Sequence, residues 1–167
     1  MDTLLQEAAE TLRAAGVQTP RLDAECLLAA ALGCNRAALY GRREGVPPGA
    51  ASRFATLLGR RAARKPLAYL TGVREFWSLP LKVTPAVLIP RPETETLVEA
   101  ILTCLADSAS RPLTVADLGT GSGAIAIALA VERPEARVFA VDVSPEALAV
   151  AAENARRCGV EQRVTFL

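Results

Sequence analysis

The residues best suited to chemistry lie in a glycine-rich stretch between residues 117 and 123. Gly119, Gly121 and Gly123 alternate with Thr120 and Ser122, and Asp117 lies two residues before the first glycine, at the end of a short apolar run. Glycine lacks a Cβ, so the backbone there can turn tightly and come close to a ligand. Asp142 follows 19 residues after Gly123, at the end of a second apolar run, where an acid can bind ribose hydroxyls. This pattern predicts a βαβ nucleotide pocket.

The acid that precedes the glycines favours one cofactor over another. A dinucleotide places its pyrophosphate at the helix N-terminus, and the Asp117 carboxylate would repel that group. S-adenosylmethionine has no phosphate and carries a sulfonium and an ammonium, both of which favour nearby anions. We therefore expect S-adenosylmethionine to be the cofactor. The candidate cofactor-binding residues are Asp117, Gly119, Thr120, Gly121, Ser122, Gly123 and Asp142.

Other interpretations of the same residues stay open. The glycines could form a strand–helix turn without a ligand, and Gly119-x-Gly121-x-x-Ala124 also fits a dinucleotide fingerprint. Asp117 could be a turn carboxylate and Asp142 a helix cap. Ser144 followed by a proline already fits the cap position, however, which leaves Asp142 available for ribose.

Several kinds of chemistry find no support in the composition. The chain of 167 residues has no histidine, so it lacks an imidazole base and the Ser-His and Cys-His nucleophile pairs. Its four cysteines show no Cys-x-x-Cys spacing, so we expect free thiols and no metal site. We assign no catalytic residue.

The first 72 residues predict a helical bundle. Thr3 and Gln6 fit a capping box for the first helix, Thr19 and the next proline cap a second, and Asn35 can cap a short third one. A fourth helix follows Pro47 and ends before Pro66, and a short turn follows it. The bases at 60, 61, 64 and 65 lie at the end of the fourth helix, where we interpret them as a solvated helix end rather than a nucleic-acid patch.

The pattern then changes from helices to short strands. Runs at 74–77, 81–83 and 87–89 are extended, and they predict a β-hairpin linker over 73–90. An amphipathic helix begins at Pro92, with Leu97 among its apolar residues. Strand and helix then alternate at 113–118, 122–132, 137–141, 145–158 and 163–167. This predicts an α/β fold in which residues 91–167 begin a parallel, Rossmann-like methyltransferase sheet.

Longer motifs carry a family resemblance over nearly the whole chain. They are Pro66–Gly72 (Pro-Leu-Ala-Tyr-Leu-Thr-Gly), Glu75-Phe76-Trp77, Ile89–Glu95 (Ile-Pro-Arg-Pro-Glu-Thr-Glu) and Asp117–Gly123. In this order they resemble the bacterial release-factor glutamine N5-methyltransferases. The related ribosomal-protein glutamine methyltransferases are similar in the glycine loop but differ after Pro-Arg.

The resemblance implies S-adenosylmethionine-dependent methylation of the glutamine side chain in the Gly-Gly-Gln motif of peptide chain release factors. The family's Asn-Pro-Pro-Tyr loop, which orients the amide, is absent from this sequence. The chain also stops after a third strand, which leaves an open sheet edge, so we expect it to be the N-terminal portion of the enzyme and inactive alone. The alternatives are a ribosomal-protein glutamine methyltransferase, a nicotinamide-dependent oxidoreductase and a non-enzymatic helical adaptor.

Charge and hydropathy bear on the partners. Net charge is +1, but residues 1–75 carry 11 basic and 7 acidic side chains, whereas residues 76–167 carry 8 and 11. We therefore expect residues 1–72 to recognise the release factor, with no sequence-specific nucleic-acid binding. No apolar run is long enough for a membrane span, and the N-terminus is unlike a secretion signal, which predicts a cytoplasmic protein.

Overall fold

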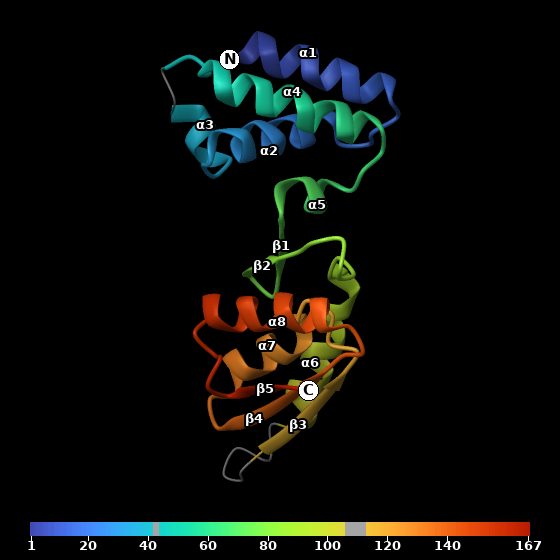
Figure 1. Ribbon diagram of the computed structural model, residues 1–167, viewed down its shortest axis with the longest axis vertical. Coiled ribbons are helices and arrows are strands. Elements are labelled where there is room, and N and C mark those ends of the chain that lie inside the picture. The colour runs from blue at the N-terminus through green and yellow to red at the C-terminus, as the bar shows by residue number, and fades with distance from the viewer. Residues whose placement is uncertain (42–43, 106–112) are drawn as a thin grey trace. The chain divides into compact units, whose positions relative to one another are not determined.

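The computed structural model describes residues 1–41, 44–105 and 113–167 and divides the chain into two compact units (Figure 1). The first unit is Met1–Thr71 and the second is Gly72–Leu167. Among the described residues, no helix combines the length and the apolar character needed to cross a bilayer. Each unit has its own hydrophobic core.

The first unit is helical, as expected. Its helices are α1 (Asp2–Ala14), α2 (Pro20–Leu32), α3 (Ala37–Gly41), α4 (Pro48–Ala62) and α5 (Leu67–Thr71). Leucines and alanines fill its core because one apolar stripe of each long helix faces the others. Leu12, Leu27 and Leu28 are fully buried there.

The structure confirms only some of the helix caps that the sequence predicts. Asn35 caps α3, with its Oδ1 accepting a hydrogen bond from the Ala38 amide at 2.9 Å, which confirms that prediction. The capping box at Thr3 and Gln6 was wrong, because α1 already begins at Asp2 and Gln6 donates to Glu10 instead. Thr19 is the N-cap residue of α2, yet its hydroxyl donates to Asp23 rather than capping the helix.

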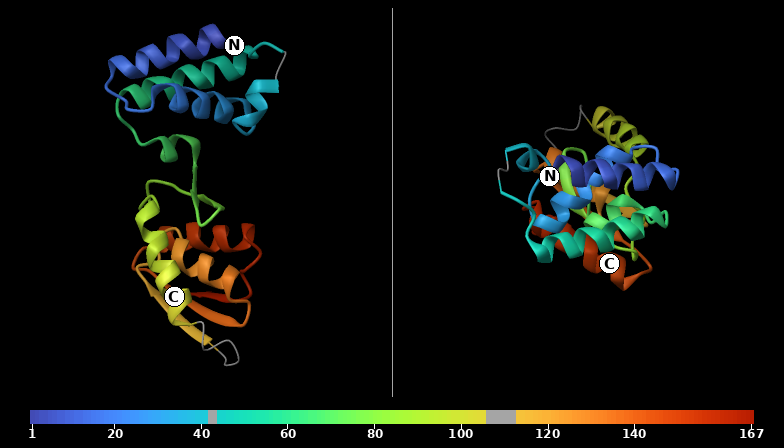
Figure 2. Two further views of the ribbon diagram at one scale, coloured as in Figure 1. Left: turned by 180° about the vertical axis from the view of Figure 1, so that it is seen from behind. Right: turned by 90° about the horizontal axis from the view of Figure 1, so that it is seen from above.

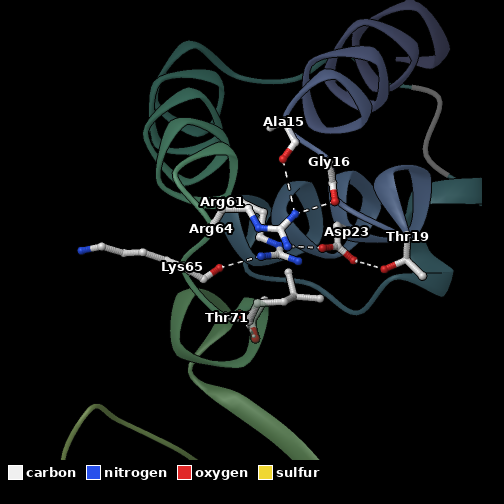
Figure 3. A network of polar contacts seen from close by, with 9 residues as sticks. Ala15, Gly16, Thr19, Asp23, Arg61, Arg64, Lys65 and Thr71 are labelled. Atoms are coloured by element: carbon white, nitrogen blue, oxygen red, sulfur yellow. Dashed lines mark hydrogen bonds and ion pairs between the residues drawn. The ribbon is translucent and has the colours of Figure 1, made fainter.

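The basic cluster at the end of α4 is not a simple solvated helix end. Arg61 Nε donates to Asp23 Oδ2 at 2.7 Å, and the Asp23 side chain is only 3% exposed (Figure 3). Arg64 Nη1 donates to the carbonyls of Ala15 and Gly16 at the end of α1. These two arginines therefore tie α4 to α1 and α2, an interaction that a local charge pattern does not reveal.

The second unit opens with an antiparallel hairpin of β1 (Val73–Phe76) and β2 (Leu79–Lys82). Its two-residue turn puts Trp77 at φ +53° and Ser78 at φ +57°, a conformation that usually selects glycine or asparagine. Two carboxylates hold the turn: Trp77 donates its amide to Glu95 at 2.9 Å and its indole Nε1 to Glu132 at 2.7 Å. Phe76 and Leu81 are buried in the core of the second unit, so the hairpin is part of that unit's packing.

The rest of the second unit is a parallel α/β sheet, which confirms the expected fold class. Its elements are η1 (Pro92–Thr94), α6 (Glu95–Cys104), β3 (Leu113–Leu118), α7 (Ala124–Glu132), β4 (Ala136–Val141), α8 (Pro145–Arg157) and β5 (Val164–Phe166). The strand order is β3-β4-β5, with Val115 opposite Val138 and Val138 opposite Val164.

Both crossover helices lie on the same side of this sheet. Figure 1 and Figure 2 show α7 and α8 together above the strands, as two crossovers of one handedness require. The residues of β4 that face them, Ala136, Val138 and Ala140, are buried. On the opposite face Leu118 is 77% exposed, so the described helices cover only one face.

Two sequence expectations differ from the structure in this region. Residues 87–89 form no strand, because the Val87 amide turns back to the Thr84 carbonyl and prolines flank the segment. Leu97 is half exposed rather than part of the buried stripe of α6, where Val98 is fully buried. Residues 107–112, a polar stretch of the sequence before the first predicted parallel strand, lie outside the described residues.

The Arg61–Asp23 pair generates a stability prediction. Arg61→Met should lower the free energy of unfolding by about 3–5 kcal/mol, because the Asp23 carboxylate would remain buried without its cationic partner. Urea unfolding followed by circular dichroism measures this. Arg60→Met, on the exposed side of the same helix, should cost less than about 0.5 kcal/mol. Equal losses in the two variants would contradict the assigned role of the pair.

Candidate cofactor-binding site

The glycine loop lies where the carboxyl ends of β3 and β4 meet, as expected for a parallel sheet. The amides of Gly119 and Thr120 both donate to the Val141 carbonyl, at 2.8 and 2.9 Å. The loop therefore bends across the end of β4 before α7 begins at Ala124. This bend brings the loop beside Asp142, the residue that follows β4.

The three glycines serve two different physical needs. All three have positive φ, +79° at Gly119, +55° at Gly121 and +80° at Gly123. A Cβ built on Gly119 or Gly121 would meet no protein atom within 4 Å, so open space lies beside the loop there. A Cβ on Gly123 would lie 2.9 Å from Ile127 Cδ1 and 3.1 Å from Ala151 Cβ. Gly123 therefore permits close helix packing, whereas Gly119 and Gly121 leave room for a ligand.

Asp117 lies within the loop's own hydrogen-bond network. Its Oδ2 accepts a hydrogen bond from the Thr120 hydroxyl at 2.7 Å, and Thr120 is 7% exposed. This contact matches the turn carboxylate that the sequence left as an alternative. A carboxylate can accept about four hydrogen bonds, so the contact leaves acceptor capacity on Asp117.

Asp142 is held by the backbone on two sides. Its Oδ1 accepts from the Ser144 amide at 3.0 Å and its Oδ2 from the Gly121 amide at 2.8 Å. These hydrogen bonds, led by the one from Ser144, keep the pKa of the Asp142 carboxyl below its usual value. Its stabilising contribution is therefore present above the unfolded-state pKa and is lost only as the pH falls through the lower folded-state pKa.

Ser144 performs the capping role expected of it. Its Oγ accepts a hydrogen bond from the Ala147 amide at 3.1 Å at the start of α8. Asp142 is thus not needed as the side-chain cap, and it remains half-buried beside the loop. The structure brings Asp117 to Thr120 and Asp142 to Gly121, while Ser122 is buried at the loop's inner side.

The sequence analysis missed Asn154. This residue of α8 is fully buried, and its amide Nδ2 donates to the carbonyls of Ser122 and Lys82, both at 2.9 Å. Its Oδ1 accepts from the Lys82 amide at 2.7 Å. A signal was available, because Asn154 follows Ala147 and Ala151 on the buried face of α8, where a polar residue needs a specific partner.

Metal coordination finds no support in the part of the chain that the structure describes. Those residues contain no group of three or more histidine, cysteine, aspartate or glutamate side chains that could hold an ion. The four cysteines are free thiols. Burial raises the pKa of the Cys26 and Cys158 thiols, so neither is poised as a thiolate.

Comparison with known proteins gives each part of the chain a counterpart. Residues 3–72 match the PrmC N-terminal domain, and residues 109–167 match a methyltransferase domain. The release factor glutamine methyltransferase of Moorella thermoacetica is 55% identical over 164 residues, which cover 98% of this chain and 57% of that protein. The enzyme of the same name from Escherichia coli is 45% identical, covering 94% of this chain and 55% of that protein.

By sequence, the chain is similar to the release factor glutamine methyltransferases over almost its whole length. The resemblance carried by the motifs is thus confirmed over almost the entire chain, and the chain spans about half the length of the curated relatives it matches. Among solved structures, an S-adenosylmethionine-dependent methyltransferase from Agrobacterium tumefaciens aligns with a TM-score of 0.48 and 24% identity. That alignment covers 57% of this chain and 31% of that protein.

The different surroundings of Gly123 and Gly121 lead to a matched prediction. Gly123→Ala should lower the free energy of unfolding by about 2–4 kcal/mol, because it adds a clash with α8 to the strain of a positive φ. Gly121→Ala should cost about 1–2 kcal/mol, since only the backbone strain applies. Urea unfolding followed by the fluorescence of Trp77, the one tryptophan, measures both. The reverse order of the two variants would contradict this account of the loop.

Proposed function

We propose that this protein uses S-adenosylmethionine to methylate the side-chain amide nitrogen of a glutamine in a peptide chain release factor, within its Gly-Gly-Gln motif. The observation that carries the proposal is the 45–55% identity, over more than nine-tenths of the chain, to proteins named for this activity. The same proposal places the protein in the cytoplasm, where release factors act.

The described residues of the loop fit the cofactor. Gly119 and Gly121 leave open space for a ligand, and two carboxylates flank that space. Asp142 stays ionised at neutral pH and keeps free lone pairs beyond its two backbone contacts, so it can accept both ribose hydroxyls. Asp117 adds negative charge, which suits a cofactor with a sulfonium and an ammonium and opposes a pyrophosphate.

The proposed reaction depends mainly on positioning. When bound, S-adenosylmethionine supplies an electrophilic methyl group on its sulfonium. An amide nitrogen is a weak nucleophile, because its lone pair is delocalised into the carbonyl. Holding the nitrogen in line with the methyl group can therefore supply much of the rate enhancement. The contribution we assign to this chain is to hold the cofactor through residues 117–123 and Asp142.

The competing functions differ in what they predict. A ribosomal-protein glutamine methyltransferase would share the cofactor loop, but the Ile89–Glu95 string favours the release factor as substrate. In the structure Glu95 of this string holds the turn of the hairpin. A nicotinamide-dependent oxidoreductase would need a pyrophosphate beside Asp117, and a helical adaptor would not use the loop at all.

Calorimetry with the 167-residue chain tests the cofactor assignment. S-adenosylmethionine should bind and NADH should not. Asp142→Ala should weaken binding by about 1–3 kcal/mol, the range for losing a partly buried acceptor of ligand hydroxyls. Glu161→Ala, which removes one negative charge at an exposed position, is the control and should leave the affinity unchanged. Binding of NADH without binding of S-adenosylmethionine would refute the assignment. Equal affinity for S-adenosylmethionine in the wild type, Asp142→Ala and Glu161→Ala would refute it as well.

A second experiment tests the docking role proposed for the helical unit. Amide hydrogen exchange is measured on the whole chain with and without a release factor. Slowed amides should cluster in residues 1–71, because this unit carries the excess of basic side chains. A short Gly-Gly-Gln peptide is the control and should leave this unit unchanged. Slowing confined to residues 113–167 would refute the docking role.

A further inference from the structure

Asn154 connects three elements of the second unit at one buried point. It lies in α8, it contacts the carbonyl of Ser122 in the glycine loop, and it contacts both backbone groups of Lys82 at the end of β2. The residue is fully buried, and Ser122 is 3% exposed. These hydrogen bonds are thus shielded from water, which cannot easily replace them.

The hydrogen-bonding groups of the Asn154 side chain match the backbone groups that surround it. The three backbone groups that surround it are one N–H and two carbonyls. A primary amide offers one acceptor oxygen and two donor hydrogens, which is the complementary set. Aspartate would turn an acceptor toward the two carbonyls, and leucine would leave all three backbone groups without this partner. Asparagine therefore pairs with all three backbone groups, whereas aspartate and leucine, which have a similar size, do not.

The contact also bears directly on the shape of the loop. Ser122 immediately precedes Gly123, whose amide donates to the Thr120 carbonyl at 2.8 Å. Fixing the Ser122 carbonyl thus fixes the peptide plane between the open part of the loop and the start of α7. On the other side, the Lys82 side chain pairs with Glu153 of α8 at 2.5 Å, which adds a second link between the hairpin and this helix.

We propose that Asn154 is a positioning residue that locks the glycine loop to the β1–β2 hairpin, so that cofactor binding at the loop stabilises the hairpin. This inference rests on the proposed function, since it takes the loop to be the S-adenosylmethionine site. Coupling of this kind is reciprocal: whatever orders the hairpin raises the affinity of the loop for the cofactor.

The loop-locking role is tested without any cofactor. Amide exchange is measured by NMR in the wild-type chain, in Asn154→Asp and Asn154→Leu, and in Val150→Ala. Val150 is 7% exposed on the same helix and serves as the control for general destabilisation. The Gly121 and Gly123 amides should exchange about tenfold faster in the Asn154 variants than in Val150→Ala at matched unfolding stability. Equal rates would overturn the role.

The coupling is tested in the wild-type chain, so it does not depend on whether a variant folds. S-adenosylmethionine should slow exchange of the Lys82 amide, which donates to Asn154, more than that of the adjacent Val83 amide, which donates to Gly72. Slowing at Gly121 and Gly123 without any at Lys82 would overturn the coupling.

The affinity for S-adenosylmethionine is the third measurement. Asn154→Leu should bind S-adenosylmethionine about tenfold more weakly than Val150→Ala at matched stability, and equal affinities would overturn the positioning role. If the wild-type chain binds no S-adenosylmethionine, the proposed function fails and the coupling fails with it. The cofactor-free exchange rates still decide whether Asn154 locks the loop, so the two failures are distinguishable.

Discussion

The close approach of α7 to α8 at Gly123 is the constraint on which the site depends. A side chain at this position would meet Ile127 and Ala151, so the start of α7 can sit this deep only without a Cβ. With α7 placed there, the chain has few residues in which to leave β3 and begin the helix. The amides of Gly119 and Thr120 reach the end of β4 within that span. The Gly121 amide then faces Asp142 at the end of β4, so helix packing determines which loop amide meets the acid.

The turn between β1 and β2 also has a strained backbone, and side chains from distant parts of the sequence stabilise it. The hairpin turn places Trp77 and Ser78 at positive φ, which costs about 1–2 kcal/mol for each residue with a side chain. Glu95 and Glu132 accept hydrogen bonds from the Trp77 amide and indole, and the part-buried one to Glu95 is the kind that can offset such a cost. The turn is therefore stable because distant acids hold it, although its own residues disfavour the conformation.

These two features show which parts of the structure a sequence can predict. The strands and helices around the loop were predictable to within a few residues, because apolar periodicity and glycine spacing are local signals. The partners of Arg61, Glu95 and Asn154 were not, since each hydrogen bond joins residues 18 or more positions apart. The missing strand at 87–89 has a different, local cause, because its apolar residues resemble a strand while the flanking prolines and the turn from Thr84 to Val87 prevent pairing.

Electrostatics links the observed loop to the proposed cofactor. Two backbone amides stabilise the charged form of Asp142, so the carboxylate is an anion before any ligand arrives. Asp117, near the end of β3, is joined to the same loop through the hydroxyl of Thr120. An anionic ligand would have to approach both carboxylates, whereas a cationic one gains from both without rearranging the loop. A site whose charges are already oriented in this way needs little reorganisation on binding, which is the condition under which electrostatic contacts contribute most. The arrangement therefore supports a cofactor with a positive charge near its reacting centre, and it disfavours a dinucleotide even though the glycine spacing would accept one.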